Sequence, residues 1–438
     1  MQNQFYALAD NLTQELKRDE IFTCWFSGER SDFVRFNHGR IRQAGNVTQR
    51  YLSLRLIARG RQASVSLTLA GDGGDLALAR STLAELRTIL DDLAEDPYLL
   101  YATDIHSSEN KRSGALPSPS DSVEQIVAEA QGLDLVGIYA AGTIFRGFAN
   151  SLGQRNWHEV ENFNFEWSLY HQADKAVKTG YAGFEWQAET LREKMRAAVC
   201  QLELLQRPAR SIAPGEYRAF LAPRALEEVV GILAWGGLSA KARRTKQSPL
   251  IKMEQGATLS PQVTLRENTA AGTAAAFQSD GFTKPEFVTL IDQGKLAAPL
   301  IAPRTAKEYG LTSNGANGGE SPESIEMSAG TLANADALAA LDTGLLINNV
   351  WYLNYSDRAA CRLTGMTRFA TFWVERGKIV APVNVMRFDD TLYRILGDNL
   401  AALTQEQDLM LDSSSYGERS AQSSRLPGAL VTALKFTL

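Results

Sequence analysis

The chain contains 438 residues, carries a formal net charge of −5 and is 44% hydrophobic. A chain of this length can form two or three domains with filled cores, and its acidic balance offers no basic surface for nucleic acid. No apolar run approaches the roughly 20 residues of a membrane-spanning helix, and the first residues lack a signal-peptide pattern. The three cysteines are far apart, which argues against a disulfide framework and fits a reducing compartment. We therefore expect a cytoplasmic globular protein that binds neither nucleic acid nor a membrane.

The first part of the chain has the pattern of a sheet flanked by helices. Residues 4–18 space their apolar side chains as a helix does, and residues 21–69 alternate apolar and polar residues with glycine at the reversals. This period of two predicts an antiparallel meander with one buried face. Asp75 can cap a helix that extends to Leu93 and covers this sheet.

The middle of the chain continues this pattern up to a proline-rich break. Residues 106–120 are polar and rich in proline and serine, which predicts a surface connection at which the first unit could itself divide. The elements predicted next are a helix over 123–130, strands over 133–139, 142–157 and 162–170, and a helix over 191–205. Residues 207–215 contain two prolines and a glycine, which interrupt regular structure. We place the main boundary there, with domains at 1–209 and 210–438.

The second half favours strands. A strand over 216–221 precedes a helix over 225–235, and two later segments, 291–300 and 374–383, share the pattern [IV]-[DE]-x-G-K-[LI]-x-A-P-[LV]. Both have the pattern of a β-hairpin with glycine at the turn. Residues 413–424 are serine-rich, and we expect them to be exposed. The predicted fold class is α+β: an N-terminal α/β-type domain with an antiparallel sheet and covering helices, followed by a β-rich C-terminal domain.

The sequence lacks the motifs of several common catalytic sites. It has no P-loop, no GxGxxG after a strand and no GxSxG elbow. A zinc peptidase needs closely spaced imidazoles and a carboxylate that activates water. The pair His158-Glu159 is followed by Asn162 and Phe163 where a second histidine would complete HExxH or HExxxH. The other three histidines are isolated, and we expect them at the surface: His38, His106 and His171.

A longer stretch, residues 343–388, is similar to a known family. It reads GLLINNVWY, then LTGMTR, then TFWVERGKIVAPV, and ends in RF. In this order these motifs resemble the C-terminal signature of the TldD/PmbA family, which contains zinc peptidases and metal-free partner subunits. Further similar segments extend the resemblance over most of the chain: 220–225, 237–240, 247–250, 277–281 and 304–311.

The resemblance implies that this chain lacks a zinc site of its own. Zinc-bearing members carry HExxxH on the helix that opens the C-terminal domain, and residues 227–232 align with that motif. Glu228 retains the glutamate, but Glu227 and Ile232 replace the two histidines. The chain therefore resembles the PmbA (TldE-like) members. We expect no catalytic residue and no cofactor in it, zinc only in a TldD-type partner, and Glu228 as a solvated helix residue.

By this resemblance the chain is a non-catalytic partner subunit of a TldD/PmbA-type metalloprotease that acts on peptides or unfolded polypeptides. An exposed sheet edge in the β-rich half could hold an extended peptide through main-chain hydrogen bonds. Arg362, Thr364 and Arg368 are candidates for lining that surface, although an ordinary turn with surface arginines explains them equally well.

Two alternatives stay open. One is a stand-alone homodimeric protein that binds peptides without hydrolysing them, and the other is a divergent peptidase that uses other groups. The expected partner is accordingly a zinc-bearing TldD-type subunit or a second copy of this chain.

Overall fold

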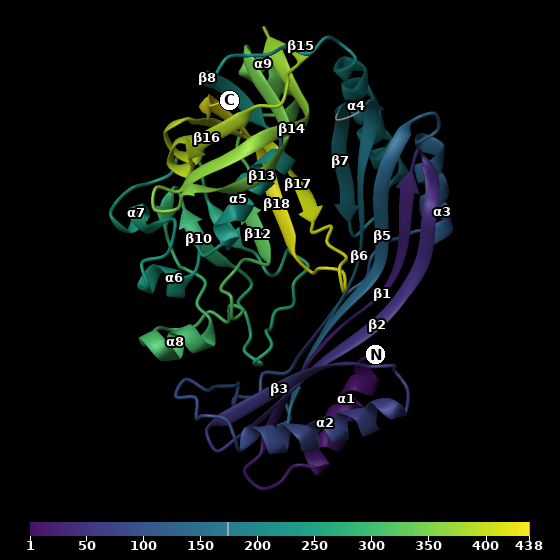
Figure 1. The fold of residues 1–438 in the computed structure, drawn as a ribbon, viewed down its shortest axis with the longest axis vertical. Helices are drawn as coiled ribbons and strands as arrows, with labels where there is room; N and C mark the ends of the chain where they lie inside the picture. Colours follow the sequence, from purple (N-terminus) through teal and green to yellow (C-terminus); the bar gives the residue numbers. More distant parts are fainter. Residues whose placement is uncertain (173–174, 438) are drawn as a thin grey trace.

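The computed structural model describes residues 1–172 and 175–437, which form two large β-sheets with helices packed on them (Figure 1). The first sheet uses strands from the N-terminal half, and the second uses strands from residue 215 onward. The α+β class expected from the sequence is confirmed. In the part of the chain that the structure describes, no helix has the length and apolar character needed to cross a membrane.

The first sheet has seven strands in the order β3-β2-β1-β5-β6-β4, with β7 paired to β6. All neighbours are antiparallel except β4 and β6, so the predicted meander over residues 21–69 is confirmed. The strands are β1 Ile21–Asn37, β2 Arg40–Ala58, β3 Arg61–Thr68, β4 Ser108–Arg112, β5 Asp134–Asn150, β6 Arg155–Gln172 and β7 Lys175–Gly183.

Four helices cover this sheet: α1 Gln2–Gln14, α2 Gly74–Leu90, α3 Pro119–Glu129 and α4 Ala188–Leu205. The apolar faces of α1 and α2 pack at one end of the sheet, where Phe5, Leu8 and Leu83 join a core with Phe22 and Leu54. Helices α3 and α4 pack at the other end. Their helical spacing of apolar residues is what directs these faces inward.

Two strands differ from the sequence expectation. The segment 106–120, predicted as a surface connection, contains β4, and no strand was predicted over 175–183, where β7 lies. Strand β4 is polar and mostly exposed, so it lacks the alternation that marks a half-buried strand. Strand β7 reads KAVKTGYAG, in which small residues and two glycines weaken the strand pattern.

The second sheet has the order β11-β10-β9-β12-β18-β16-β14-β13-β8, with β15 on β14, β17 on β18, and a further pairing between β18 and β8. Its strands are β8 Gly215–Leu221, β9 Leu265–Glu267, β10 Val288–Asp292, β11 Lys295–Leu296, β12 Ser324–Met327, β13 Gly344–Asp357, β14 Arg362–Glu375, β15 Lys378–Pro382, β16 Arg387–Thr391, β17 Leu400–Leu411 and β18 Ser423–Phe436.

Both hairpins predicted from the repeated pattern are confirmed, as β10–β11 and β14–β15. Their two-residue turns, Gln293-Gly294 and Arg376-Gly377, have positive φ at both positions. This is the geometry of the type I′ turn, whose twist matches that of the flanking strands.

Short helices surround the second sheet. They are α5 Pro223–Gly231, η1 Ile232–Ala234, α6 Ala240–Arg244, α7 Ile251–Glu254, α8 Pro303–Tyr309, η2 Asn334–Asp336, α9 Ala337–Leu341 and η3 Arg394–Asp398. The buried face of α5 packs into the core of this half.

The two halves share one apolar core. Helix α4 and strands β5 to β7 pack there with residues of the second sheet, including Leu346, Phe372 and Leu430. Because this core takes residues from both sheets, it holds them face to face along one side.

The loop between β17 and β18 joins the halves a second time. It was predicted to be exposed, and Tyr416 at its tip is 99% exposed. Arg419, however, is buried, as are Ser423 and Ser424. The Arg419 guanidinium donates to the Gly142 carbonyl at 3.3 Å and to Asn162 of the first sheet, which buries this arginine although most of the segment is exposed or half-buried.

Candidate functional site

A cleft of about 320 Å³ lies between the two sheets. One wall comes from the first sheet, with Glu166 of β6 and Lys178 of β7, and the opposite wall comes from α5. In Figure 1, β17 and β18 lie on the side of the second half that faces β6 and β7. The rest of the lining comes from Pro322, Glu323, Ile325, Asn349 and the two ends of the β17–β18 loop.

The sequence of α5 explains why it presents a charged face to this cleft. Pro223 occupies the first turn, where the N–H that proline lacks would have no intrahelical partner. The apolar residues lie on one face and enter the core: Ala225, Leu226, Val229 and Val230. The other face lines the cleft, with Arg224, Glu227, Glu228 and Gly231.

An ion-pair network connects α5 with the first sheet. Arg224 Nη1 lies 3.0 Å from Glu166 Oε1, and Lys178 Nζ lies 3.2 Å from the same oxygen. Glu227 on the next turn of α5 accepts a hydrogen bond from the Ser424 hydroxyl of β18. The network therefore links both sheets and α5 through polar side chains.

Two adjacent carboxyl groups of α5 have pKa values raised above the usual range for glutamate. Burial between the cleft walls raises the pKa of Glu227, and the Ser424 hydroxyl partly offsets this. Desolvation also raises the pKa of Glu228, against the opposing charge of Lys178. The negative charge of Glu166 acts in the same direction as desolvation at both groups. A protonated carboxyl group can donate a hydrogen bond to a bound molecule, which a carboxylate cannot do.

Strand β7 presents main-chain groups to the second half of the molecule. Within the described part of the first sheet it pairs with β6 alone. The Lys178 carbonyl points away from β6, since it accepts a 3.0 Å hydrogen bond from the Asn349 side chain. In an antiparallel strand the N–H and C=O of one residue point to the same side, and every second residue repeats that direction. The main-chain groups of Ala176, Lys178 and Gly180 therefore face away from β6.

A second cavity of about 210 Å³ continues the cleft along β7. It shares Lys178 and Arg224 with the first cavity and is bordered by α4 through Lys194, Ala198 and Gln201. The two cavities together form what we call the interlobe groove. Gly180 lets the Arg224 guanidinium lie against β7, because a Cβ at this position would displace it.

The sequence model of the PmbA/TldA metallopeptidase C-terminal domain matches residues 214–438, just over half of the chain. The chain belongs to the PmbA/TldD family. This confirms the resemblance found in the sequence. The comparison with curated protein sequences gives no match.

Solved structures share the whole fold of this PmbA/TldD family member. A candidate modulator of a DNA gyrase from Thermotoga maritima is 14% identical with a TM-score of 0.79, covering 99% of this chain and 100% of that chain. TldE from Thermococcus kodakarensis is also 14% identical with a TM-score of 0.79, covering 99% of this chain and 100% of that chain. A candidate modulator of DNA gyrase from Bacteroides thetaiotaomicron is 16% identical with a TM-score of 0.75, covering 99% of this chain and 98% of that chain. At these identities the likeness shows the fold alone.

The donors in the cleft do not suit a zinc ion of the kind a PmbA/TldD metallopeptidase would use. Peptidase zinc is held by imidazoles with a carboxylate or thiolate. No histidine or cysteine is among the residues that line the cleft, and Glu166 is already paired with two cations. Among residues 1–172 and 175–437, no group of three or more His, Cys, Asp or Glu side chains could hold a metal. No metal-dependent step is assigned to this cleft.

Two of the three positions aligned with the family's zinc motif lie in the cleft. Glu227 and Glu228 line it, whereas Ile232 is 4% exposed and packs in the core of the second half at the start of η1. Residues four positions apart share one face of a helix, so the residue beside Glu227 on the cleft face of α5 is Gly231 and not Ile232. The assignment of these positions to a degenerate zinc motif stays a prediction.

The three candidate substrate-binding residues lie on β14, and none of them lines the groove: Arg362, Thr364 and Arg368. Arg362 pairs with Asp389 at 3.3 Å, and the Arg368 guanidinium lies 4.4 Å from the centroid of the Trp351 ring. Thr364 donates to a main-chain carbonyl of β16 at 3.1 Å. Arg368 stands opposite Asn349 in the β13–β14 register, so it is one strand away from the groove. Their role in substrate binding stays a prediction.

Many groove residues could not be identified from the sequence, among them one each from β6, β7, β13 and β18: Glu166, Lys178, Asn349 and Ser424. Each belongs to an ordinary strand pattern, and no local motif marks it. Only the pairing of β7 with β6 and the position of β18 beside α5 bring them together.

Proposed function

We propose that this chain is the non-catalytic partner subunit of a TldD/PmbA-type metalloprotease and that it holds an extended peptide in the interlobe groove. Zinc and the water it activates would come from a TldD-type subunit. Membership of the family and the fold likeness to a solved TldE support the subunit role. The scattered cysteines support a cytoplasmic setting.

One observation carries the peptide-binding part of the proposal: the edge of β7 that faces away from β6 runs along the groove and pairs with no other strand among the described residues. Its one described hydrogen bond to the second half comes from the Asn349 side chain. Main-chain groups of Ala176, Lys178 and Gly180 face the second half, and an extended peptide would pair with them through main-chain hydrogen bonds. Such pairing tolerates any peptide sequence. The edge belongs to the first sheet, whereas the sequence had suggested an edge in the β-rich half.

The charges of the groove add a preference that main-chain pairing lacks. Its acidic side chains outnumber its basic side chains, and Lys178 and Arg224 already form ion pairs with Glu166. We therefore expect basic and neutral peptides to bind more tightly than acidic ones, and the difference to shrink at high salt.

A pair of variants at residue 178 tests the β7 edge. Lys178→Pro removes the N–H that faces the groove and leaves the hydrogen bonds to β6 in place. Lys178→Ala is the matched control, because it removes the same side chain and its ion pair with Glu166 but keeps the N–H. We expect the proline variant to bind an unstructured fluorescent peptide about threefold to tenfold more weakly than the alanine variant, as the loss of one hydrogen bond predicts. Equal affinities would contradict the proposal.

Reconstitution tests the subunit role. Peptide hydrolysis should require both this chain and a TldD-type homologue, and a chelator should abolish it. Hydrolysis by this chain alone would favour the divergent peptidase. A homodimer that binds peptide and takes no TldD-type partner would favour the stand-alone binding protein.

A further inference from the structure

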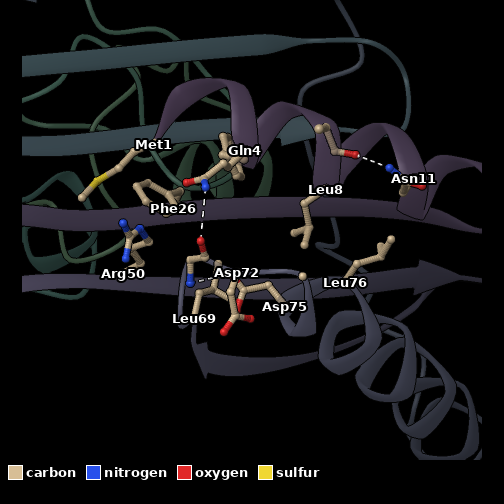
Figure 2. Close-up of a pocket in the computed structure, with 14 residues that line it drawn as sticks. Met1, Gln4, Leu8, Asn11, Phe26, Arg50, Leu69, Asp72, Asp75 and Leu76 are labelled. Atoms are coloured by element: carbon tan, nitrogen blue, oxygen red, sulfur yellow. Dashed lines mark hydrogen bonds between the residues drawn. The ribbon is translucent and has the colours of Figure 1, made fainter.

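A separate cavity of about 280 Å³ lies under helix α1 (Figure 2). Helix α1 lies at the opposite end of the first sheet from α3 and α4 (Figure 1). Helix α1 forms one side, and the turn between β3 and α2 forms the other. The Gln4 amide connects the two sides by a 3.2 Å hydrogen bond to the Gly71 carbonyl. None of the residues that line this cavity lines the interlobe groove. A molecule bound here would be independent of the proposed peptide site.

The interior of this cavity is apolar. Its walls contain Met1, Phe5, Ala7, Leu8, Phe26, Leu69 and Leu76. Phe5, Leu8 and Phe26 are also members of the core that α1 forms with the sheet, so they hold the floor rigid. An apolar cavity of about 150 Å³ can hold benzene, which gives this cavity room for an apolar body of roughly ten carbon atoms.

Arg50 lies beside the cavity and has unused hydrogen-bond donors. Arg50 of β2 donates from Nη1 to the Ala70 carbonyl at 3.3 Å, and its buried Nε has no hydrogen-bond partner. It forms no ion pair with any residue that the structure describes. A Cβ on Gly71 would come within 2.6 Å of the Arg50 guanidinium carbon, so glycine at this position leaves room for the guanidinium beside the turn. A guanidinium that forms no ion pair, next to an apolar cavity, is suited to a carboxylate.

The acidic residues on the rim are engaged in the turn itself. The two carboxylate oxygens of Asp75 accept hydrogen bonds from the Ala70 and Gly71 N–H groups, each at 2.8 Å. Asp72 accepts one from the Gly74 N–H at 2.8 Å. These bonds fix the conformation of the turn, and neither carboxylate forms an ion pair with Arg50.

We propose that this cavity binds a small amphiphilic carboxylate, with the apolar body under α1 and the carboxylate on Arg50. A medium-chain fatty acid and the apolar C-terminal residue of a peptide both present this chemistry. The same site would bind either ligand, since it recognises one negative group and one apolar body of limited size.

Calorimetric titration of the full chain with matched probes tests the site. Octanoate should bind at least tenfold more tightly than octan-1-ol, which has the same apolar chain without the charge. Arg50→Gln should remove this difference while leaving octan-1-ol unaffected. Arg42→Gln changes an exposed arginine on the same strand and should leave both affinities unchanged.

Two further measurements identify the source and guard against misfolding. N-acetylphenylalanine and its amide represent the peptide C-terminus. If octanoate does not bind and N-acetylphenylalanine binds but its amide does not, the site is assigned to peptides.

Ala7→Phe, on the exposed side of α1, should block the binding of every probe. The melting temperature of each variant shows whether that variant is folded. If Arg50→Gln does not fold, Arg50→Met gives a second test, because it keeps the apolar stem of the side chain and removes the charge. Equal binding of octanoate and octan-1-ol, octanoate binding unaffected by Arg50→Gln, or no binding of any probe would overturn the proposal.

Discussion

Two of the regions where the halves of the molecule meet differ in their polar chemistry. In the interlobe groove, Glu166 pairs with two cations, and two carboxyl groups of α5 have raised pKa values. At the β17–β18 loop, Arg419 is buried and donates to oxygens of the first sheet. The groove can exchange hydrogen-bond partners, but the Arg419 junction cannot do so without leaving a charge unpaired in the interior. Because the ends of the same loop line the groove, the rigid junction fixes one wall of an adaptable site.

The largest effect should come from breaking the rigid junction. Arg419→Met leaves the Asn162 and Gly142 oxygens without their donor and Glu29 without its nearby cation. We expect a loss of about 3–5 kcal/mol in the free energy of unfolding, measured by denaturant titration. Tyr416→Ala on the same loop is the control, because its exposed side chain should contribute less than about 0.5 kcal/mol. Similar stabilities of the two variants would refute a rigid junction.

The next largest effect concerns the pH dependence of the groove wall. Glu267 is buried and accepts hydrogen bonds from the N–H groups of Glu323 and Ser324, and Glu323 lines the groove. Desolvation raises the pKa of Glu267 to about 7. The unfolded chain releases this proton near pH 4.5, whereas the folded chain keeps it until about pH 7. Stability should therefore fall as pH rises between these values, by at most about 3 kcal/mol.

Glu267→Gln isolates this contribution. Buried His158 has a pKa lowered to about 4 and acts in the opposite direction, because it stabilises the fold as pH rises from about 4 to 6.5. The difference in unfolding free energy between Glu267→Gln and the unmodified protein removes the His158 contribution. This difference should vary with pH between about 4.5 and 7, and a constant difference would show that Glu267 does not titrate there.

A smaller effect is expected from crowding the groove at β7. Gly180→Ala places a Cβ against Arg224 and displaces it from Glu166, which should cost about 1 kcal/mol of stability and weaken peptide binding. Gly183→Ala on the same strand is the matched control, since its Cβ would find its nearest neighbour at 3.4 Å. Fluorescence anisotropy with the same peptide compares the two, and equal peptide affinities would place the peptide elsewhere.

The smallest effect separates the groove from β14. If peptides lie along β7, Arg362→Ala and Arg368→Ala should change peptide affinity by less than about twofold, because neither residue lines the groove. The sequence-based hypothesis, in which they line the peptide surface, expects a larger loss at unchanged melting temperature. The same binding titration decides between them.

Local patterns account for what could be predicted. The glycine turns of the two hairpins and the apolar stripe of α5 follow from residues close in sequence, and Glu227 and Glu228 were placed on the correct helix. Strand β7 and the buried Arg419 could not be predicted in this way. The position of Arg419 depends on hydrogen-bond partners more than 200 residues away in the sequence. Strand β7 consists largely of small residues, and its extended conformation depends on pairing with β6.

The zinc content of this chain, purified alone and without a metal-binding tag, tests the central claim most directly. The account predicts far less than one zinc per chain, because Glu227, Gly231 and the paired Glu166 offer no suitable ligand set. Stoichiometric zinc would contradict the non-catalytic assignment and return attention to the four histidines.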